Sequence, residues 1–331
     1  MKKAKVIGCG LSGIVSAILL KNKGYDVKIF DKRSHIGGNC YDKVKSGTLM
    51  HEYGPHIFHT DDEEVFSFLN KYTDWIDFKL QPKGNSRLGL ISLPYSKKTI
   101  SEIGRELSQE EILEYIFKEY SEKQWGVPFD QIPSTITNRI PKTKDCEDPT
   151  WFEGQKYQCV PKEGYTKMFD RMLLGIEVQL NSEDEDWQTH RADLTIYTGK
   201  IDEFFKFKHG KLPYRSLLFD HQTTESKMPH FIENQNNSWN KYTRVYDHRF
   251  FQPHKINRTT IITKEYSVLH DDSNIPFYPI PFGDGQEIYQ KYKLEIQNEP
   301  NTIFIGRLAT YKYLDMWMAI RSAMNIINKV N

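Results

Sequence analysis

The beginning of the chain carries the pattern that most restricts its fold. Residues 5–7 (KVI) predict a short buried strand, and the sequence GCGLSG follows at residues 8–13. A mostly apolar stretch then predicts a helix that ends near Gly24, and residues 26–30 predict a second strand that delivers Asp31. This order is typical of a dinucleotide-binding Rossmann fold: a strand, a G-x-G-x-x-G turn, a helix, a second strand and an acidic residue within about 30 residues.

Each part of this motif has an expected role in holding a nucleotide. Gly8 is expected to form the tight turn, Gly10 to let the backbone approach a pyrophosphate, and Gly13 to let the helix pack on the strand. The pyrophosphate would lie at the helix N-terminus, where free N–H groups and the helix dipole favour an anion. Asp31 is expected to accept a hydrogen bond from a ribose hydroxyl.

A second glycine motif follows the acid. Where many NAD-binding chains continue into another βα unit, this chain continues KRSHIGGN, which places Gly37 and Gly38 six and seven residues after Asp31. Glycines here would let the backbone approach the nucleotide closely for a second time. The pair resembles the signature of flavoproteins related to amine oxidases, in which FAD lies extended through the domain. FAD is therefore favoured over NAD.

Charge and cysteine content narrow the range of partners. The 331 residues suffice for two or three domains, and the formal net charge of +1 gives no overall field favouring nucleic acid or an acidic membrane. No run of about 18 apolar residues is present, so no membrane span is expected. The four cysteines form no C-x-x-C pair, which favours reduced thiols in a cytoplasmic protein over a metal cluster or a disulfide framework.

The segment HEYGPHIFHT at residues 51–60 raises the question of a metal site. His56 and His59 have i, i+3 spacing, which on a helix could suit zinc, but Gly54–Pro55 disfavours a helix here and no carboxylate motif follows. A loop beside the cofactor is the favoured interpretation, with a plain structural loop as the alternative. No metal is expected.

Residues 99–140 predict mostly helix. Ser108 and Glu111 match a capping box that begins an amphipathic helix. Tyr120 and Trp125 fall at the C-terminal end of this helix, where core packing and a place in a binding site are equally consistent with the pattern.

The remainder of the chain predicts two kinds of sheet. Residues 176–198 and 301–306 predict strands that rejoin the N-terminal sheet, whereas residues 207–280 contain strands separated by Pro, Asn and Gly, which is typical of an antiparallel sheet. The predicted fold class is α/β, with a Rossmann-like FAD-binding domain, a small helical domain and an antiparallel β-sheet domain. The expected domains are a discontinuous FAD-binding domain (1–75, 165–205, 296–331), a helical domain (99–140) and a substrate domain (76–98, 141–164, 206–295).

Several segments, in this order, carry a more specific resemblance: DKRSHIGGNCYD, YGPHIFHT, YSEKQWG, GYT, YTGKIDEFF, YTRVYDHRFF, FYPI and GRLATYKYLDM. Together they resemble the bacterial UDP-galactopyranose mutase family. The resemblance implies a substrate cleft between the three domains and reduced FAD as the active cofactor. It also implies that the flavin N5 attacks the anomeric carbon of a UDP-hexopyranose without net redox change. The oligomeric state stays open, with a homodimer as one option.

The resemblance also implies roles for individual residues. Arg139 and Arg244 match phosphate-binding arginines, and the planar guanidinium suits a diphosphate because it forms charge-assisted bidentate bonds. The implied catalytic residues are Arg139, Arg244, Tyr313 and Asp315. The implied substrate contacts are Tyr120, Trp125, Arg139, Arg244, Glu265, Tyr278 and Tyr313. The implied cofactor contacts are Gly8, Gly10, Ser12, Gly13, Asp31, Lys32, Gly38, Asn39, His56, Arg307, Asp315 and Met316.

Two alternatives to this function remain open, and so does the substrate. A flavin oxidase or desaturase could use the same FAD fold, and a nucleotide-binding protein with a decayed site would lack catalysis altogether. Residues 76–99 fit the family loosely, and Trp151–Phe152 stands where a tyrosine-rich segment is usual. UDP-galactose is the expected substrate, with another nucleotide hexopyranose as the alternative.

Overall fold

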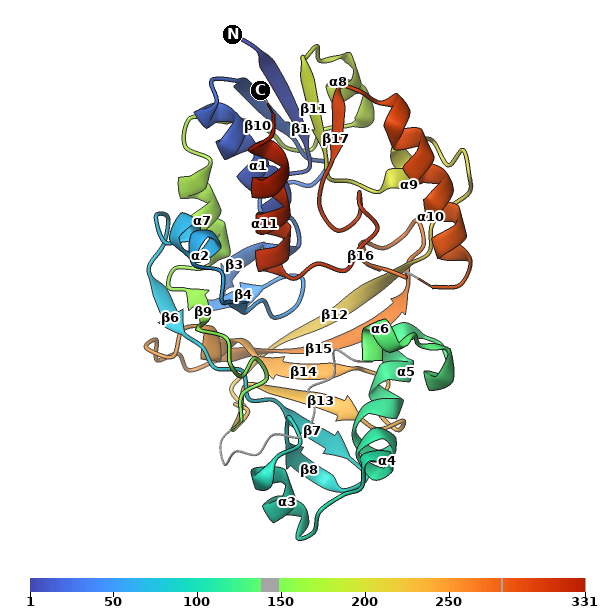
Figure 1. Ribbon diagram of the computed structural model, residues 1–331. Coiled ribbons are helices and arrows are strands. Elements are labelled where there is room, and N and C mark those ends of the chain that lie inside the picture. The colour runs from blue at the N-terminus through green and yellow to red at the C-terminus, as the bar shows by residue number, and fades with distance from the viewer. Residues whose placement is uncertain (138–148, 281, 331) are drawn as a thin grey trace.

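The computed structural model describes residues 1–137, 149–280 and 282–330. Figure 1 shows a parallel sheet with its helices in the upper part of the molecule and a larger sheet with a helical cluster in the lower part. The predicted combination of a Rossmann-like domain with helical and antiparallel parts is confirmed.

The upper sheet has five parallel strands in the order β10-β2-β1-β11-β17. Its strands are β1 (Lys3–Ile7), β2 (Asp26–Phe30), β10 (Glu177–Gln179), β11 (Leu194–Tyr197) and β17 (Thr302–Phe304). Helices α1 (Leu11–Asn22), α7 (Tyr165–Met172) and α11 (Met316–Ile327) pack on it through one apolar core. Strands and helices from distant parts of the sequence therefore complete the sheet that begins with the N-terminal nucleotide-binding motif.

The lower sheet has seven strands in the order β16-β12-β15-β14-β13-β7-β8. All neighbours are antiparallel except β13 and β7, which run parallel. The strands are β7 (Lys83–Ser86), β8 (Gly89–Ser92), β12 (Tyr214–Thr224), β13 (Ile232–Asn236), β14 (Arg244–Asp247), β15 (Thr260–Leu269) and β16 (Pro276–Pro279). The long pair β12 and β15 carries ten residues in register and forms the spine of this sheet.

The helical part contains α3 (Lys97–Ile103), α4 (Gln109–Ile112), a π-helical segment (Leu113–Lys118), α5 (Glu119–Trp125), a 3₁₀ turn (Phe129–Gln131) and α6 (Ser134–Thr137). The predicted capping box is confirmed, because the Ser108 side chain accepts from Glu111 N at 3.2 Å and Glu111 Oε2 accepts from Ser108 N at 2.9 Å. The π segment was not predicted. It lengthens one turn within an otherwise continuous helix, a distortion that is frequent at functional sites.

Two small sheets link the large ones. One has the order β5-β9-β6 (Phe58–Thr60, Tyr157–Pro161, Trp75–Asp77), and the other pairs β3 (Asp42–Lys45) with β4 (Thr48–His51). The remaining helices are α2 (Glu63–Leu69), α8 (Asp184–Thr189), α9 (Ile201–Phe204) and α10 (Asp284–Glu295), with 3₁₀ turns at Gly38–Cys40, His248–Phe251 and Ile296–Asn298. The domain boundaries expected above remain a proposal, and within them β9 pairs with β5 and β6 instead of joining the seven-stranded sheet.

Among the described helices, none is long and apolar enough to cross a membrane. In the same part of the chain, no group of three His, Cys, Asp or Glu side chains is placed to hold a metal ion. His59, one of the two histidines considered above, lies on β5, where its Nδ1 is 2.7 Å from Gln155 Oε1.

Candidate active site

The glycine loop after β1 is packed too tightly for side chains. Gly8 has a φ of +104°, and a Cβ there would lie 2.0 Å from Thr198 Oγ1. A Cβ on Gly13 would lie 1.9 Å from the Gly8 carbonyl oxygen and 3.2 Å from Val6 Cγ1. Gly13 thus lets α1 approach β1, as the motif predicts, and the N-terminus of α1 opens at the carboxyl end of the parallel sheet.

The second glycine motif lies directly against this loop. Gly37 N donates to Cys9 O at 2.8 Å, and a Cβ on Gly38 would lie 2.8 Å from Gly10 Cα. The Asp31 carboxylate joins the same arrangement, because Oδ2 accepts from Cys9 N at 2.6 Å and Oδ1 accepts from Arg33 N at 2.8 Å. Asp31 therefore stabilises the glycine loop after β1 through hydrogen bonds to the backbone, a role the sequence did not indicate.

A cavity of about 280 Å³ opens at this end of the parallel sheet. Of the twelve residues that the family resemblance implies as cofactor contacts, eleven line this cavity: Gly8, Gly10, Ser12, Asp31, Lys32, Gly38, Asn39, His56, Arg307, Asp315 and Met316. The twelfth, Gly13, lies beneath the loop at the contact between α1 and β1.

A second cavity of about 640 Å³ lies between the parallel sheet, the large sheet and the helical part. It is lined by five of the residues that the family resemblance implies as substrate contacts: Tyr120, Trp125, Arg244, Tyr278 and Tyr313. The two cavities share the residues Asn39, His56, Phe277, Arg307, Asp315 and Met316, so they meet at the start of α11. Of the other two residues implied for the substrate, Glu265 lies behind Arg244, and Arg139 lies outside the described residues.

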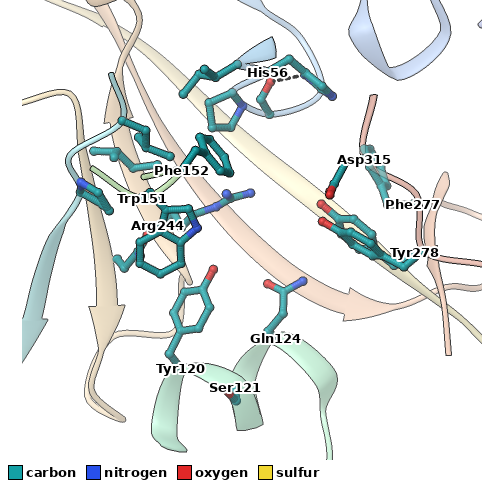
Figure 2. A pocket seen from close by; sticks show the side chains of 18 of the residues that line it. His56, Tyr120, Ser121, Gln124, Trp151, Phe152, Arg244, Phe277, Tyr278 and Asp315 are labelled. Carbon is teal, nitrogen blue, oxygen red and sulfur yellow. Dashed lines mark hydrogen bonds between the residues drawn. The ribbon is translucent and has the colours of Figure 1, made fainter. Parts of the chain in front are cut away.

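Arg244 is held in place by Glu265. The two are directly opposite in the β14–β15 register, so both side chains emerge on the same face of the sheet. Arg244 Nε donates to Glu265 Oε1 at 3.0 Å, and Nη2 donates to Oε1 and Oε2 at 2.7 and 2.8 Å. The Glu265 side chain is fully buried, whereas 23% of the Arg244 side chain is exposed. In Figure 2 the Arg244 guanidinium points into the space that faces Tyr278.

Burial acts against the charge of Arg244, but the Glu265 carboxylate and the nearby Tyr120 and Tyr278 outweigh it and hold the arginine pKa well above its ordinary value. Burial also raises the pKa of Tyr120 and that of Tyr278. The cavity therefore presents a permanent cation together with hydroxyls that stay protonated and can donate. This combination is suited to an anionic group such as a diphosphate.

Arg307 supplies a second cation at the junction of the two cavities. Its guanidinium carbon lies 5.1 Å from the Tyr278 ring centre and 5.0 Å from that of Tyr313, which themselves stack at 5.6 Å. Nη1 donates to Phe277 O at 3.2 Å and Nη2 to Leu314 O at 2.6 Å. These contacts fix the arginine beside Asp315 and the N-terminus of α11.

His56 is neutral and its tautomer is determined. Burial lowers the His56 pKa to about 4, with further lowering from the cations Arg307 and Arg244. Its Nδ1 lies 2.8 Å from the Gly54 carbonyl, which can only accept, so Nδ1 carries the proton. His56 Nε2 is then left as an acceptor where the two cavities meet.

Two polar residues of the larger cavity were not anticipated from the sequence. Gln124 Oε1 and Asn236 Oδ1 are buried without a hydrogen-bond partner in the described part of the chain. The Asn236 amide donates to Ile116 O in the π segment, which leaves its oxygen available. Gln124 lies four residues after Tyr120, so both occupy one helical face, a spacing that could have identified it.

Comparisons with known proteins identify the family of this chain. A family model described as UDP-galactopyranose mutase matches residues 115–313, and a model of an NAD(P)-binding Rossmann-like domain matches residues 6–72. The chain belongs to the UDP-galactopyranose mutase family. Its membership places it among isomerases, and the residues of the larger cavity described above fall mostly within the matched segment.

Individual members of the UDP-galactopyranose mutase family match over almost the entire chain. The dTDP-fucopyranose mutase of Escherichia coli is 33% identical, covering 98% of this chain and 97% of its own length. A probable UDP-galactopyranose mutase of Klebsiella pneumoniae is 32% identical, covering 98% and 93%. The crystal structure of a reduced UDP-galactopyranose mutase superposes with a TM-score of 0.80 at 13% identity, covering 100% of this chain and 94% of that one, which shows the shared fold.

Proposed function

We propose that this protein is a flavin-dependent nucleotide-sugar mutase that interconverts UDP-galactopyranose and UDP-galactofuranose. The observation that carries the proposal is the Arg244–Glu265 pair, which presents a fixed cation to a cavity that opens into the cofactor cavity. A flavin ring at the junction would lie between the residues implied for the cofactor and those implied for the substrate.

The residues of the smaller cavity fit FAD. The loop from Gly8 to Gly13 and the N-terminus of α1 would hold the pyrophosphate, because Gly10 has no side chain to block its approach. Asp31 and Lys32 line the end of the cavity suited to the adenosine ribose. Arg307, His56 and Asp315 line the end that opens into the larger cavity. When bound and reduced, the flavin would supply a nucleophilic nitrogen for the anomeric carbon of the sugar.

The protein's own residues would hold the nucleotide while the glycosidic bond is broken and reformed. Arg244 would bind the diphosphate and stabilise the charge that develops as it departs. Tyr278 and Tyr313 would donate hydroxyl hydrogen bonds to the same phosphates, and Arg139 is proposed as a second phosphate-binding arginine. Tyr120 and Trp125 would contact the substrate on the side of the helical part.

A second substrate deserves a direct test, because the chain is as similar to a dTDP-fucopyranose mutase as it is to a probable UDP-galactopyranose mutase. Uracil and thymine present the same imide edge, whereas the two nucleotides differ at the 5-methyl group and at the ribose 2′-hydroxyl. The alternative substrate is therefore a dTDP-linked 6-deoxyhexopyranose.

The experiment is an assay of FAD-loaded protein with UDP-galactose and dTDP-fucose, before and after reduction by dithionite. We expect conversion to the furanose form only after reduction, and we expect no net oxidation of the substrate. Equal activity of the oxidised protein would contradict the proposed use of flavin. Oxygen consumption in proportion to substrate would instead support the oxidase alternative.

A further inference from the structure

Helix α5 carries four residues of the larger cavity, Tyr120, Ser121, Gln124 and Trp125, and it ends directly over the large sheet. Figure 1 shows α5 beside the strands of this sheet. The last carbonyls of any helix have no partner within the helix. Gly126 N satisfies Glu122 O at 2.7 Å, and the carbonyls of Lys123 and Gln124 are among those left to be satisfied from outside.

Arg215 of β12 satisfies both carbonyls. Its Nε donates to Gln124 O at 3.0 Å, and its Nη2 donates to Lys123 O at 3.3 Å. The residue is only 5% exposed, and within the described ranges it forms no ion pair with a carboxylate. A cation at this point complements the negative end of the helix dipole. Burying an arginine without a carboxylate is costly, so its position is a specific feature of the site.

Ser267 of β15 joins the same contact. Its Oγ donates to Gln124 O at 2.7 Å and accepts from Arg215 Nη2 at 3.0 Å. Arg215 is opposite Leu269 and Ser267 is opposite Leu217, so Arg215 and Ser267 are diagonal neighbours on one face of the β12–β15 pair. Glu265 lies two residues before Ser267 on the same face.

Two further contacts restrict the end of α5. Gly126 has a φ of +72°, and a Cβ there would lie 2.6 Å from Arg215 Nη1, so the arginine packs against the residue that ends the helix. On the other side, Lys123 Nζ donates to Asn240 O at 3.0 Å and to Tyr242 O at 3.3 Å in the β13–β14 connection. The helix end is therefore held by side chains whose partners are backbone carbonyls.

We propose that Arg215 and Ser267 are positioning residues that set the orientation of α5 for binding the nucleotide sugar. The proposal rests on the proposed function and adds a specific device to it: the face of the sheet that holds the phosphate-binding Arg244 also fixes the helix carrying Tyr120, Gln124 and Trp125. The distance across the larger cavity is then set by side-chain contacts between β12, β15 and α5.

The test uses FAD-loaded protein and the variants Arg215→Gln, Arg215→Lys, Ser267→Ala and Ser267→Thr. The first readout is backbone amide exchange of residues 119–126, and the second is the dissociation constant of UDP measured on the oxidised protein. Arg215→Gln should accelerate exchange in this segment and weaken UDP binding by about 5- to 30-fold, the effect of losing one or two kcal/mol from hydrogen bonds to a charged group.

The conservative variants separate positioning from general stability. Ser267→Thr keeps the hydroxyl and should bind UDP as the wild type does, whereas Ser267→Ala should weaken it. Arg215→Lys should restore part of the affinity because it keeps the charge but loses the fork. FAD content should stay unchanged in all four variants, because the cofactor cavity includes neither residue. Arg258→Ala is the matched control, since Arg258 pairs with Glu225 at the surface and its side chain is 84% exposed.

Unchanged exchange of residues 119–126 in Arg215→Gln would overturn the proposal. So would faster exchange accompanied by unaltered UDP binding, because the helix would then be anchored without consequence for the ligand. Wild-type protein that fails to bind UDP would overturn the proposed function itself, and in that case the exchange experiment still decides whether Arg215 and Ser267 anchor α5.

Discussion

Arg244 and Glu265 face each other across β14 and β15, and three hydrogen bonds of 2.7 to 3.0 Å join the guanidinium to a carboxylate that is fully buried. The carboxylate fixes the direction of the arginine, while the exposed part of the guanidinium faces the larger cavity. This division of roles leads to separate predictions for binding and for stability.

Replacing Arg244 should impair the reaction. If the arginine holds the departing diphosphate, Arg244→Ala should cost about 2 to 5 kcal/mol of transition-state stabilisation, roughly a thirty- to several-thousand-fold loss of kcat/KM. Arg244→Lys should recover only part of this loss because it cannot form the bidentate contact. The measurement is kcat/KM of reduced, FAD-loaded protein, with Arg258→Ala as the control. A loss below about threefold would show that Arg244 does not bind the reacting group.

Removing only the arginine should also destabilise the fold, because Glu265 would remain buried and unpaired. Breaking such a pair costs about 3 to 5 kcal/mol, whereas replacing both partners is far less damaging. In urea unfolding we expect Arg244→Met to lower the free energy of unfolding and Arg244→Met/Glu265→Leu to recover much of it. The Glu265→Leu single variant completes the set. If the loss of unfolding free energy in the double variant equals the sum of the losses in the two single variants, this account is contradicted.

Acid should destabilise the protein through three histidines whose pKa values lie below the ordinary value. Burial holds the pKa of His56 at about 4 and those of His51 and His248 well below their ordinary value. An unfolded histidine binds its proton near pH 6.5, so these groups stabilise the native state above pH 6.5, and that contribution is lost as the pH falls toward 4. His56 alone accounts for about 3 kcal/mol over this interval, since each pKa unit corresponds to about 1.4 kcal/mol.

The test is urea unfolding at pH 7.5, 6.5 and 5.5. His248 Nδ1 accepts from His51 N at 3.2 Å and its Nε2 contacts Thr263 at 2.8 Å, so His248→Gln can keep polar contacts while removing one titrating group. Its stability should fall less steeply with acid than that of the wild type. His254→Gln, at an exposed position, should leave the slope unchanged. Identical slopes for the wild type and His248→Gln would contradict the prediction.

The glycine contact beneath the cofactor gives a prediction for flavin binding. Gly38→Ala places a Cβ 2.8 Å from Gly10 Cα and should displace the loop after β1, so the purified protein should contain much less flavin. Gly89→Ala is the control, because Gly89 also has a positive φ, of +93°, but a Cβ there meets nothing within 4 Å. Both substitutions carry a backbone cost of about 1 kcal/mol. The ratio of flavin to protein absorbance should therefore fall only in Gly38→Ala.

The sequence predicted the nucleotide end of the molecule well, because the glycines, the helix and the acid are local and follow one another directly. It also predicted the parallel and antiparallel parts, since the spacing of apolar residues and turns differs between them. The capping box at Ser108 was predicted for the same reason. Local patterns of this kind require no knowledge of distant partners.

Contacts between distant strands could not be predicted in this way. The roles of Arg215 and Ser267 depend on the β12–β15 register and on where α5 ends, and neither is encoded in a local motif. Asn236 meets the π segment only because β13 lies beside the helical part. Asp31 was expected to bind ribose, and its bonds to Cys9 N and Arg33 N became visible only once the two glycine motifs were placed together.

The parallel sheet draws its strands from three distant stretches of the chain, and this has a consequence for biosynthesis. α1 packs against α11, about 300 residues later, so the core around β1 cannot close until α11 has left the ribosome. Contacts of such long sequence separation form slowly because a large loop must be closed first. We therefore expect the nascent N-terminal segment to remain exposed to chaperones during most of translation, and a circular permutant that joins α11 to β1 should fold faster than the natural order.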